Sequence, residues 1–196
     1  MALAYTGITL ELREISLKNR PKQLYDISSK GTVPVLQLNN SSVIDESIEI
    51  MYWCLDRKDP KGWMKQNKNQ QIELVKLFDD KFKFWLDRYK YHDRYPEHDR
   101  KYYFNKSDQY LSGIESRLKE NNYIFSSNIL FVDVAIFPFI RQFANVDYSF
   151  FKNKYSNLTN WLESMMNLDL FLSVMNKYDE FIPGQEPFIV NFNQNI

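Results

Sequence analysis

The stretch GTVPVL, at residues 31–36, decides the fold together with DES at residues 45–47. A proline that opens a run of apolar residues is typical of the first position of a strand. An Asp-Glu-Ser run before helically spaced apolar residues is typical of a helix N-terminus, because short polar side chains cap the first free N–H groups. The two motifs therefore predict a strand and the start of a helix, with a short connection between them.

The residues around these motifs predict a small α/β domain over residues 1–56. Apolar and polar residues alternate in its strands, whereas its helices have apolar residues three or four positions apart. In chain order, we expect the tail of a helix at 1–5, a strand at 8–12, a short helix at 21–27, strands at 33–38 and 43–44, and a helix at 46–55. The polar turn at 39–42 joins its two neighbouring strands, which predicts an antiparallel hairpin.

A polar segment that contains proline and glycine, residues 57–66, is typical of a linker between domains. Beyond it, residues 67–196 show mainly helical spacing and predict an all-helical domain. The segment 132–143 is apolar almost all round, which indicates a helix buried on every side. Two more helices are expected at 160–166 and 168–175. Residues 179–196 contain two prolines and a glycine, and we expect an irregular tail there.

The composition argues against several classes of protein. Lys and Arg number 25 and Asp and Glu also number 25, so the chain lacks the basic excess of nucleic-acid-binding proteins and we expect no nucleic-acid partner. No run of about 18 apolar residues is present, so we expect no membrane span. Cys54 is the single cysteine and cannot form an internal disulfide, which favours a reducing compartment and hence the cytoplasm.

The bond between Val33 and Pro34 has two interpretations. X–Pro bonds adopt the cis form at modest cost. A cis bond here would turn the N–H and C=O of Val33 outward, where they can pair with an extended, peptide-like ligand. The ordinary alternative is a trans proline that begins a strand. Taken alone, the bond leaves both interpretations open.

The run Asp45-Glu46-Ser47 also has two interpretations. Asp45 is a good N-cap, and acidic residues near a helix N-terminus complement the helix dipole in many proteins. In a functional interpretation, Ser47 and the free N–H groups bind a carboxylate, and Glu46 pairs with an ammonium group. Combined with the Val33–Pro34 loop, the second interpretation suits a ligand with an extended backbone and a free amino-acid end. Glutathione is such a ligand.

At this point a resemblance becomes specific. The segments KNRPK at 18–22, KGTVPVL at 30–36 and VIDESIEI at 43–50 resemble the N-terminal domain of cytosolic glutathione transferases, most closely the bacterial and omega-like branches. The segment FVDVAIFPFIRQF at 131–143 looks like the buried core helix of that family. The resemblance covers nearly the whole chain. It implies a thioredoxin-like α/β domain that lacks its first strand, followed by an all-α C-terminal domain.

The resemblance also implies roles for individual residues. Val33, with Pro34, would bind the cysteinyl backbone of glutathione. Glu46 and Ser47 would hold its γ-glutamyl end. Arg20 matches a basic position of omega-like members that reaches the glycine carboxylate.

In the family, the catalytic Cys, Ser or Tyr belongs to the first strand and the loop after it, which would lie upstream of Met1. The catalytic residue is therefore unassigned, and we expect a truncated sequence or a misplaced start. Without that first strand, the strand at 8–12 lacks its neighbour, and its buried backbone groups need other partners. A strand donated by a partner chain and a rearranged sheet are the alternative solutions.

Other candidate groups have ordinary explanations. Cys54 lies in an apolar helical run and is expected to be a small buried residue. His92 and His98 flank acidic residues, but a solvated turn explains them, so we expect no metal site. The mixture of tyrosines and basic residues at 88–103 is expected to form a solvated helix face.

The resemblance implies an enzyme that binds glutathione as a substrate. The second substrate would be a small hydrophobic electrophile, to which glutathione is transferred, or a mixed disulfide, which is reduced. The family also implies a homodimer. The alternative is a non-catalytic scaffold with the same fold, similar to the stringent-starvation-like proteins that contact RNA polymerase.

Overall fold

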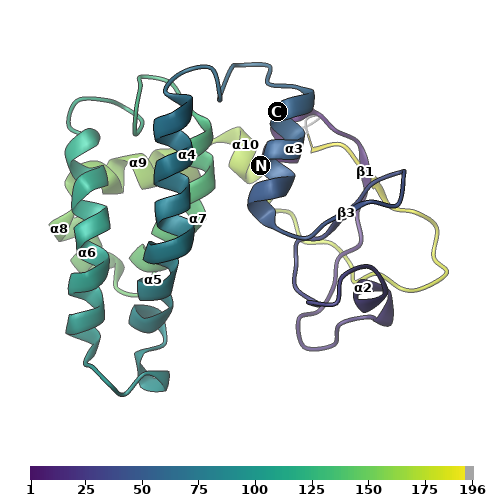
Figure 1. Cartoon of the computed structure of the whole chain (residues 1–196), viewed down its shortest axis with the longest axis horizontal. Coiled ribbons are helices and arrows are strands. Elements are labelled where there is room, and N and C mark those ends of the chain that lie inside the picture. Colours follow the sequence, from purple (N-terminus) through teal and green to yellow (C-terminus); the bar gives the residue numbers. More distant parts are fainter. Residues whose placement is uncertain (193–196) are drawn as a thin grey trace. The chain divides into compact units, whose positions relative to one another are not determined.

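The computed structural model describes residues 1–192 and divides the chain into two compact units (Figure 1). The first unit contains Met1–Lys61 and Leu168–Ile196, and the second contains Gly62–Asn167. The sequence placed the whole of 67–196 in the helical domain, whereas the structure groups the last part of the chain with the α/β unit. The reason is a strand near the C-terminus that pairs with a strand near the N-terminus.

The first unit has the α/β elements that the sequence predicts. They are α1 (Ala2–Thr6), β1 (Leu10–Glu11), α2 (Lys22–Ile27), β2 (Leu36–Gln37), β3 (Val43–Ile44) and α3 (Ser47–Arg57). Gly7 ends α1 in a left-handed conformation. Strands β2 and β3 pair antiparallel, with Leu36 opposite Ile44, so the predicted hairpin is confirmed. The hairpin leads directly into α3.

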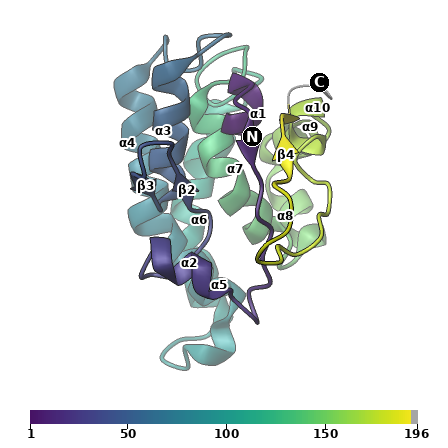
Figure 2. The same cartoon turned by 90° about the vertical axis from the view of Figure 1, so that its right-hand side faces the viewer.

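The expectation of an irregular tail at 179–196 was wrong for part of that segment. Strand β4 (Ile189–Val190) pairs antiparallel with β1, and Leu10 lies opposite Val190 (Figure 2). The N–H of Leu12 donates to the carbonyl of Phe188 at 2.8 Å. Backbone groups of the N-terminal strand therefore find partners in the same chain.

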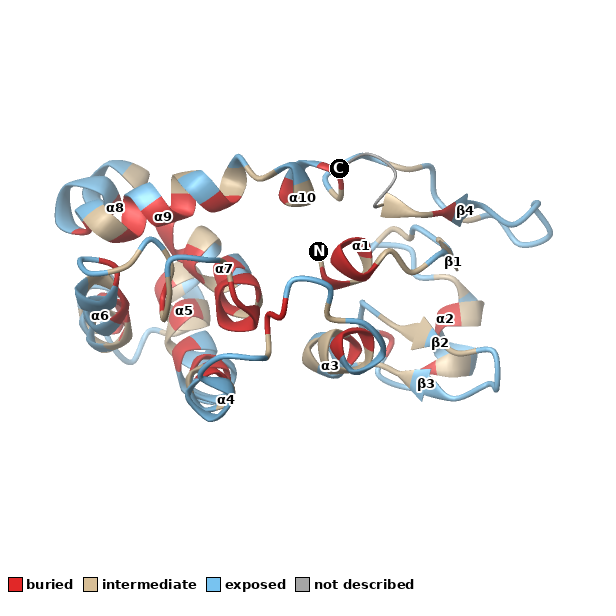
Figure 3. Ribbon diagram, turned by 90° about the horizontal axis from the view of Figure 1, so that it is seen from above, coloured by how far each residue is buried: buried red, intermediate tan, exposed pale blue. Residues whose placement is uncertain are grey.

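The core of the first unit lies where α1 packs against α3 (Figure 3). Ala2, Ile50 and Cys54 are buried there, and partly buried apolar residues of the strands and helices surround them. Alternating apolar positions of β2 and β3 turn Leu36 and Ile44 toward this cluster. The core thus fixes both the hairpin and α3, which carry the sequence motifs.

The short helix α10 (Asp169–Leu172) also belongs to the first unit, and the second unit is helical. The latter contains α4 (Lys68–Leu77), a π-helical turn η1 (Phe78–Phe82), α5 (Lys83–Lys90), a 3₁₀ turn η2 (His92–Arg94), α6 (Arg100–Arg117), α7 (Phe131–Ala144), α8 (Tyr148–Lys154) and α9 (Ser156–Met166). Helix α7 packs against α4, α5 and α9, so most of it is buried as expected, but Pro138 and Gln142 are exposed and burial on every side was wrong for that face. Helix α8 was not expected from the sequence.

Asp133 organises the start of α7. Its carboxylate accepts hydrogen bonds from the N–H groups of Ile124 at 3.0 Å and Leu130 at 2.9 Å, and from the indole N–H of Trp161 at 3.0 Å. Burial raises the pKa of Asp133 to about 6, and the three hydrogen bonds oppose that rise. One side chain therefore joins the preceding loop, α7 and α9.

Residues 1–192 contain no helix that is long and apolar enough to cross a membrane. Within the same residues, no group of three or more His, Cys, Asp or Glu side chains is arranged to hold a metal ion.

Candidate functional site

The loop before β2 presents unpaired backbone. The Val33–Pro34 peptide bond is cis, and Val33 is 46% exposed. Within the described part of the chain, neither the N–H nor the C=O of Val33 makes a hydrogen bond. Gly31 lets the chain enter this loop with a φ of +59°, and the ring of Tyr25 lies so close that a Cβ at this position would overlap it. The loop thus offers one donor and one acceptor to an extended ligand.

The N-terminus of α3 is open as well. Glu46 is its N-cap residue and no side chain caps the helix. The carbonyl of Glu46 accepts from the N–H of Ile50 at 3.0 Å, so the N–H groups of residues 47–49 have no acceptor in the helix. Ser47 is exposed, and its hydroxyl has no hydrogen-bond partner among residues 1–192. Free N–H groups and a hydroxyl in the first turn are the elements of a carboxylate site.

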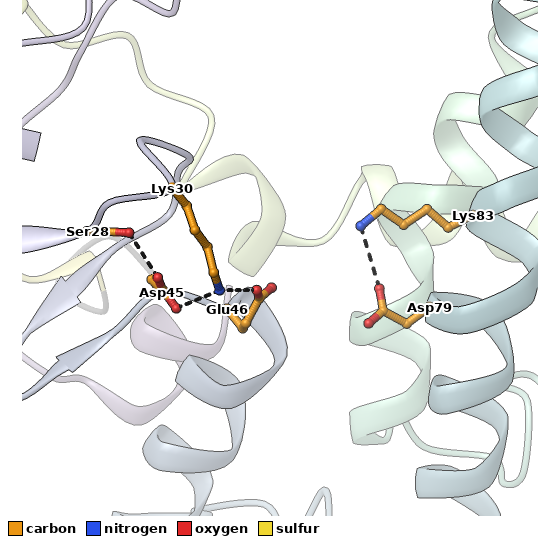
Figure 4. Close-up of polar contacts among 6 residues, drawn as sticks. All are labelled: Ser28, Lys30, Asp45, Glu46, Asp79 and Lys83. Atoms are coloured by element: carbon orange, nitrogen blue, oxygen red, sulfur yellow. Dashed lines mark hydrogen bonds and ion pairs between the residues drawn. The ribbon is translucent and has the colours of Figure 1, made fainter. Parts of the chain in front are cut away.

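Asp45 does not cap α3, contrary to the sequence prediction. Its carboxylate accepts instead from the hydroxyl of Ser28 at 2.9 Å and from the ammonium of Lys30 at 3.0 Å. The same ammonium lies 2.6 Å from Oε1 of Glu46, so one lysine bridges two adjacent carboxylates (Figure 4). Ser28 and Lys30 belong to the segment before β2, and Asp45 and Glu46 belong to the β3–α3 junction.

Charge pairing shifts the pKa values of this cluster. Hydrogen bonds to Glu46 and then to Asp45 raise the pKa of Lys30. The hydrogen bonds from Lys30 and then Ser28 lower the pKa of Asp45. Lys30 is therefore cationic and Asp45 anionic at neutral pH.

Arg20 is exposed immediately before Pro21, the N-cap residue of α2. No hydrogen bond or ion pair joins its side chain to another of residues 1–192. The structure thus brings Glu46 and Asp45 together with Lys30 and Ser28, but it records no contact that connects Arg20 to them. Lys30 and Ser28 were missed as site residues because nothing in their local sequence shows that they meet a carboxylate 15 or more residues away.

Comparison with protein families shows which family this chain belongs to. Residues 1–57 match the family described as "Glutathione S-transferase, N-terminal domain", and residues 83–164 match "Glutathione S-transferase, C-terminal domain". The two matches occur in the expected order and together cover more than half of the chain. The chain belongs to the glutathione S-transferase family. No curated protein sequence matches this chain well enough to add a relative.

Solved glutathione transferases share this fold. A class Gtt2 enzyme of Vibrio parahaemolyticus is 20% identical, with a TM-score of 0.63 over 87% of this chain and 88% of its own. A glutathione transferase of Methylobacillus flagellatus, solved with glutathione bound, is also 20% identical, with a TM-score of 0.71 over 87% and 89%. A third, from Phanerochaete chrysosporium and solved with oxidized glutathione, is 15% identical, with a TM-score of 0.74 over 88% and 86%.

The remaining candidate residues of this glutathione S-transferase family member take structural positions. Cys54 is fully buried, and burial raises the pKa of its thiol, which disfavours the reactive thiolate. His92 pairs with its neighbour Asp93 at 3.0 Å. His98 stacks on Tyr102, with ring centroids 3.8 Å apart. Burial accounts for Cys54, and contacts with neighbouring side chains account for His92 and His98.

Proposed function

We propose that this protein binds glutathione at the open N-terminus of α3 and transfers it to a small electrophilic substrate, or uses it to reduce a mixed disulfide. The observation that supports the proposal most directly is the uncapped first turn of α3, with the free hydroxyl of Ser47, in a family whose members include solved complexes with glutathione.

Each part of the proposed site suits one part of the ligand. The γ-glutamyl carboxylate would accept from the N–H groups and the hydroxyl at Ser47. The γ-glutamyl ammonium would pair with Glu46. The free backbone groups of Val33, presented next to Pro34, would pair with the cysteinyl residue as an added strand does. Arg20 would attract the glycine carboxylate through its exposed guanidinium.

The residues of this site bind and orient the ligand, and the reactive atom is the sulfur of glutathione. In conjugation, the thiolate forms a bond to an electrophilic carbon, and the leaving group departs with its bonding electrons. In reduction, the thiolate attacks one sulfur of a mixed disulfide and releases the other as a thiolate. Fixing the cysteinyl backbone limits the positions of the sulfur, which favours either reaction through proximity.

The proposal extends to the assembly and location of the protein. We propose a homodimer, as the family resemblance implies, and a cytoplasmic location, which the single buried cysteine favours. Light scattering over a concentration series measures the first, and a mass that remains that of one chain would refute it.

Isothermal titration with glutathione tests the binding site. Ser47→Ala should weaken binding about two- to tenfold because it removes one hydrogen bond to the ligand. Glu46→Gln should weaken it about two- to fivefold because it removes an exposed ion pair. Asp26→Asn is the matched control, since Asp26 also pairs with a lysine in the first unit and is 51% exposed, against 56% for Glu46.

Two outcomes would separate the enzyme from the alternative scaffold. Binding that is weakened by both site variants, together with glutathione-dependent turnover of an aryl halide or a mixed disulfide, supports the enzyme. If the folded wild-type chain does not bind glutathione at millimolar concentration, the proposed function is wrong, and a non-catalytic scaffold becomes the better interpretation.

A further inference from the structure

Lys30 occupies the place that the proposed site reserves for the ammonium group of its ligand. Its Nζ atom lies 2.6 Å from Oε1 of Glu46 and 3.0 Å from Oδ1 of Asp45 (Figure 4). Among residues 1–192, Glu46 has no other side-chain partner. The carboxylate proposed to receive an external ammonium is therefore already paired with an internal one.

The backbone holds Lys30 close to this position, while its side chain has a route to water. Lys30 directly precedes Gly31, whose φ of +59° and contact with Tyr25 fix the turn. The Lys30 side chain is 48% exposed and that of Glu46 is 56% exposed. A long side chain at such a site can leave its partner without disturbing the core, because its charged end remains solvated.

Two ammonium groups cannot share Glu46 without cost. A ligand ammonium at hydrogen-bond distance from Oε1 would lie only a few ångströms from Nζ, where like charges repel each other. The hydrogen bonds to both carboxylates also raise the pKa of Lys30, so deprotonation does not relieve this repulsion near neutral pH. Pairing of the ligand ammonium with Glu46 therefore competes with the ion pair between Glu46 and Lys30.

We propose that Lys30 is a built-in competitor of the ligand ammonium group at Glu46 and thereby lowers the affinity of the site for γ-glutamyl ligands. This inference rests on the proposed function, since it concerns the same site. Lys30 returns to the two carboxylates when the ligand leaves, so Glu46 is paired in both states. Because the ion pairs are exposed, the effect on affinity is modest, about two- to fivefold.

The test compares Lys30→Met with the wild type by isothermal titration at low ionic strength. Two probes are used: glutathione, and its desamino analogue, in which hydrogen replaces the γ-glutamyl amino group. Lys22→Met is the matched control, because Lys22 pairs with Asp26 at 2.6 Å in the same unit and its loss changes the net charge equally. Lys30→Gln serves as a second variant, and circular dichroism verifies that each chain is folded.

Lys30→Met and Lys30→Gln should bind glutathione two- to fivefold more tightly than the wild type, and Lys22→Met should not. The desamino analogue should gain little from either Lys30 variant, because it brings no ammonium to Glu46. Weaker glutathione binding by both Lys30 variants would overturn the proposal and make Lys30 a ligand for a carboxylate. Unchanged affinity would overturn it as well. Absence of glutathione binding by the wild type would instead refute the proposed function itself.

Discussion

Replacing Asp133 by alanine should destabilise the second unit strongly. The substitution leaves the N–H groups of Ile124 and Leu130 and the indole N–H of Trp161 without their acceptor. Asp133 is fully buried and Trp161 is 2% exposed, so water cannot easily replace the carboxylate. An unsatisfied buried donor costs about 1–3 kcal/mol, so three of them give a loss of about 3–9 kcal/mol in the free energy of unfolding.

The pH dependence of this loss has a definite sign. Burial raises the pKa of Asp133 to about 6 in the folded chain, from an ordinary value of 3.8. Between these two values the folded state binds more protons than the unfolded state, so the contribution of Asp133 to stability falls as pH rises through this window. A difference of about two pKa units corresponds to about 3 kcal/mol. Alanine does not titrate. The difference in the free energy of unfolding between the wild type and Asp133→Ala should therefore narrow by about that amount between pH 4 and pH 7.

Urea unfolding followed by far-ultraviolet circular dichroism, at half-unit pH steps, measures both effects. Asp133→Asn provides a milder variant that retains one acceptor oxygen, in case the alanine variant does not fold. Asp79→Asn is the control from the same unit. Asp79 is 45% exposed, and its carboxylate makes a long ion pair of 3.9 Å with the ammonium of Lys83 (Figure 4). A gap that widens as pH rises would refute the reasoning, since it would mean that the three donors outweigh burial and hold the pKa below 3.8.

Two further predictions concern the first unit. Gly31→Ala should lower the free energy of unfolding by about 1–2 kcal/mol, because alanine is strained at a φ of +59° and its Cβ overlaps Tyr25; a thermal unfolding midpoint equal to that of the wild type would contradict this. Cys54 should react with a thiol reagent at least about a hundredfold more slowly in the folded chain than in urea, since the side chain is fully buried and burial raises its pKa. Stopped-flow labelling measures that ratio, and rapid labelling of the folded chain would show an accessible thiolate.

Elements with a strong local pattern were predictable from the sequence. The hairpin of β2 and β3 follows from two apolar strands around a polar turn, and α7 follows from a run that is apolar on all sides. Strand β4 was not predictable, because two residues carry no periodicity and its partner Leu10 lies at the other end of the chain. Tertiary pairing, rather than local preference, determines that strand.

Some residues of the candidate site were likewise predictable from the sequence, and others were not. The start of α3 near Glu46 and Ser47 was predictable because helix-start residues mark it locally, whereas Val33 was placed in a strand and lies in the exposed loop before β2. The position of the Lys30 side chain was not predictable, since an exposed lysine has no burial pattern that reveals its partner. For that reason Asp45 was assigned the wrong role, that of a helix cap.

The position of the N-cap residue explains how the first turn of α3 remains open. A short polar side chain at the N-cap position ordinarily accepts from the free N–H groups of the helix and satisfies one of them. Here Glu46 holds that position and no side chain caps the helix, while Asp45 lies one residue earlier and accepts from the hydroxyl of Ser28. The N–H groups at Ser47 consequently keep their capacity to bind an anion. A helix that had been capped by its own aspartate would have to exchange that cap for the ligand carboxylate, and binding would be weaker by the strength of the cap. The N-cap lies one residue after the predicted Asp45, and this shift maintains the feature on which the proposed function depends.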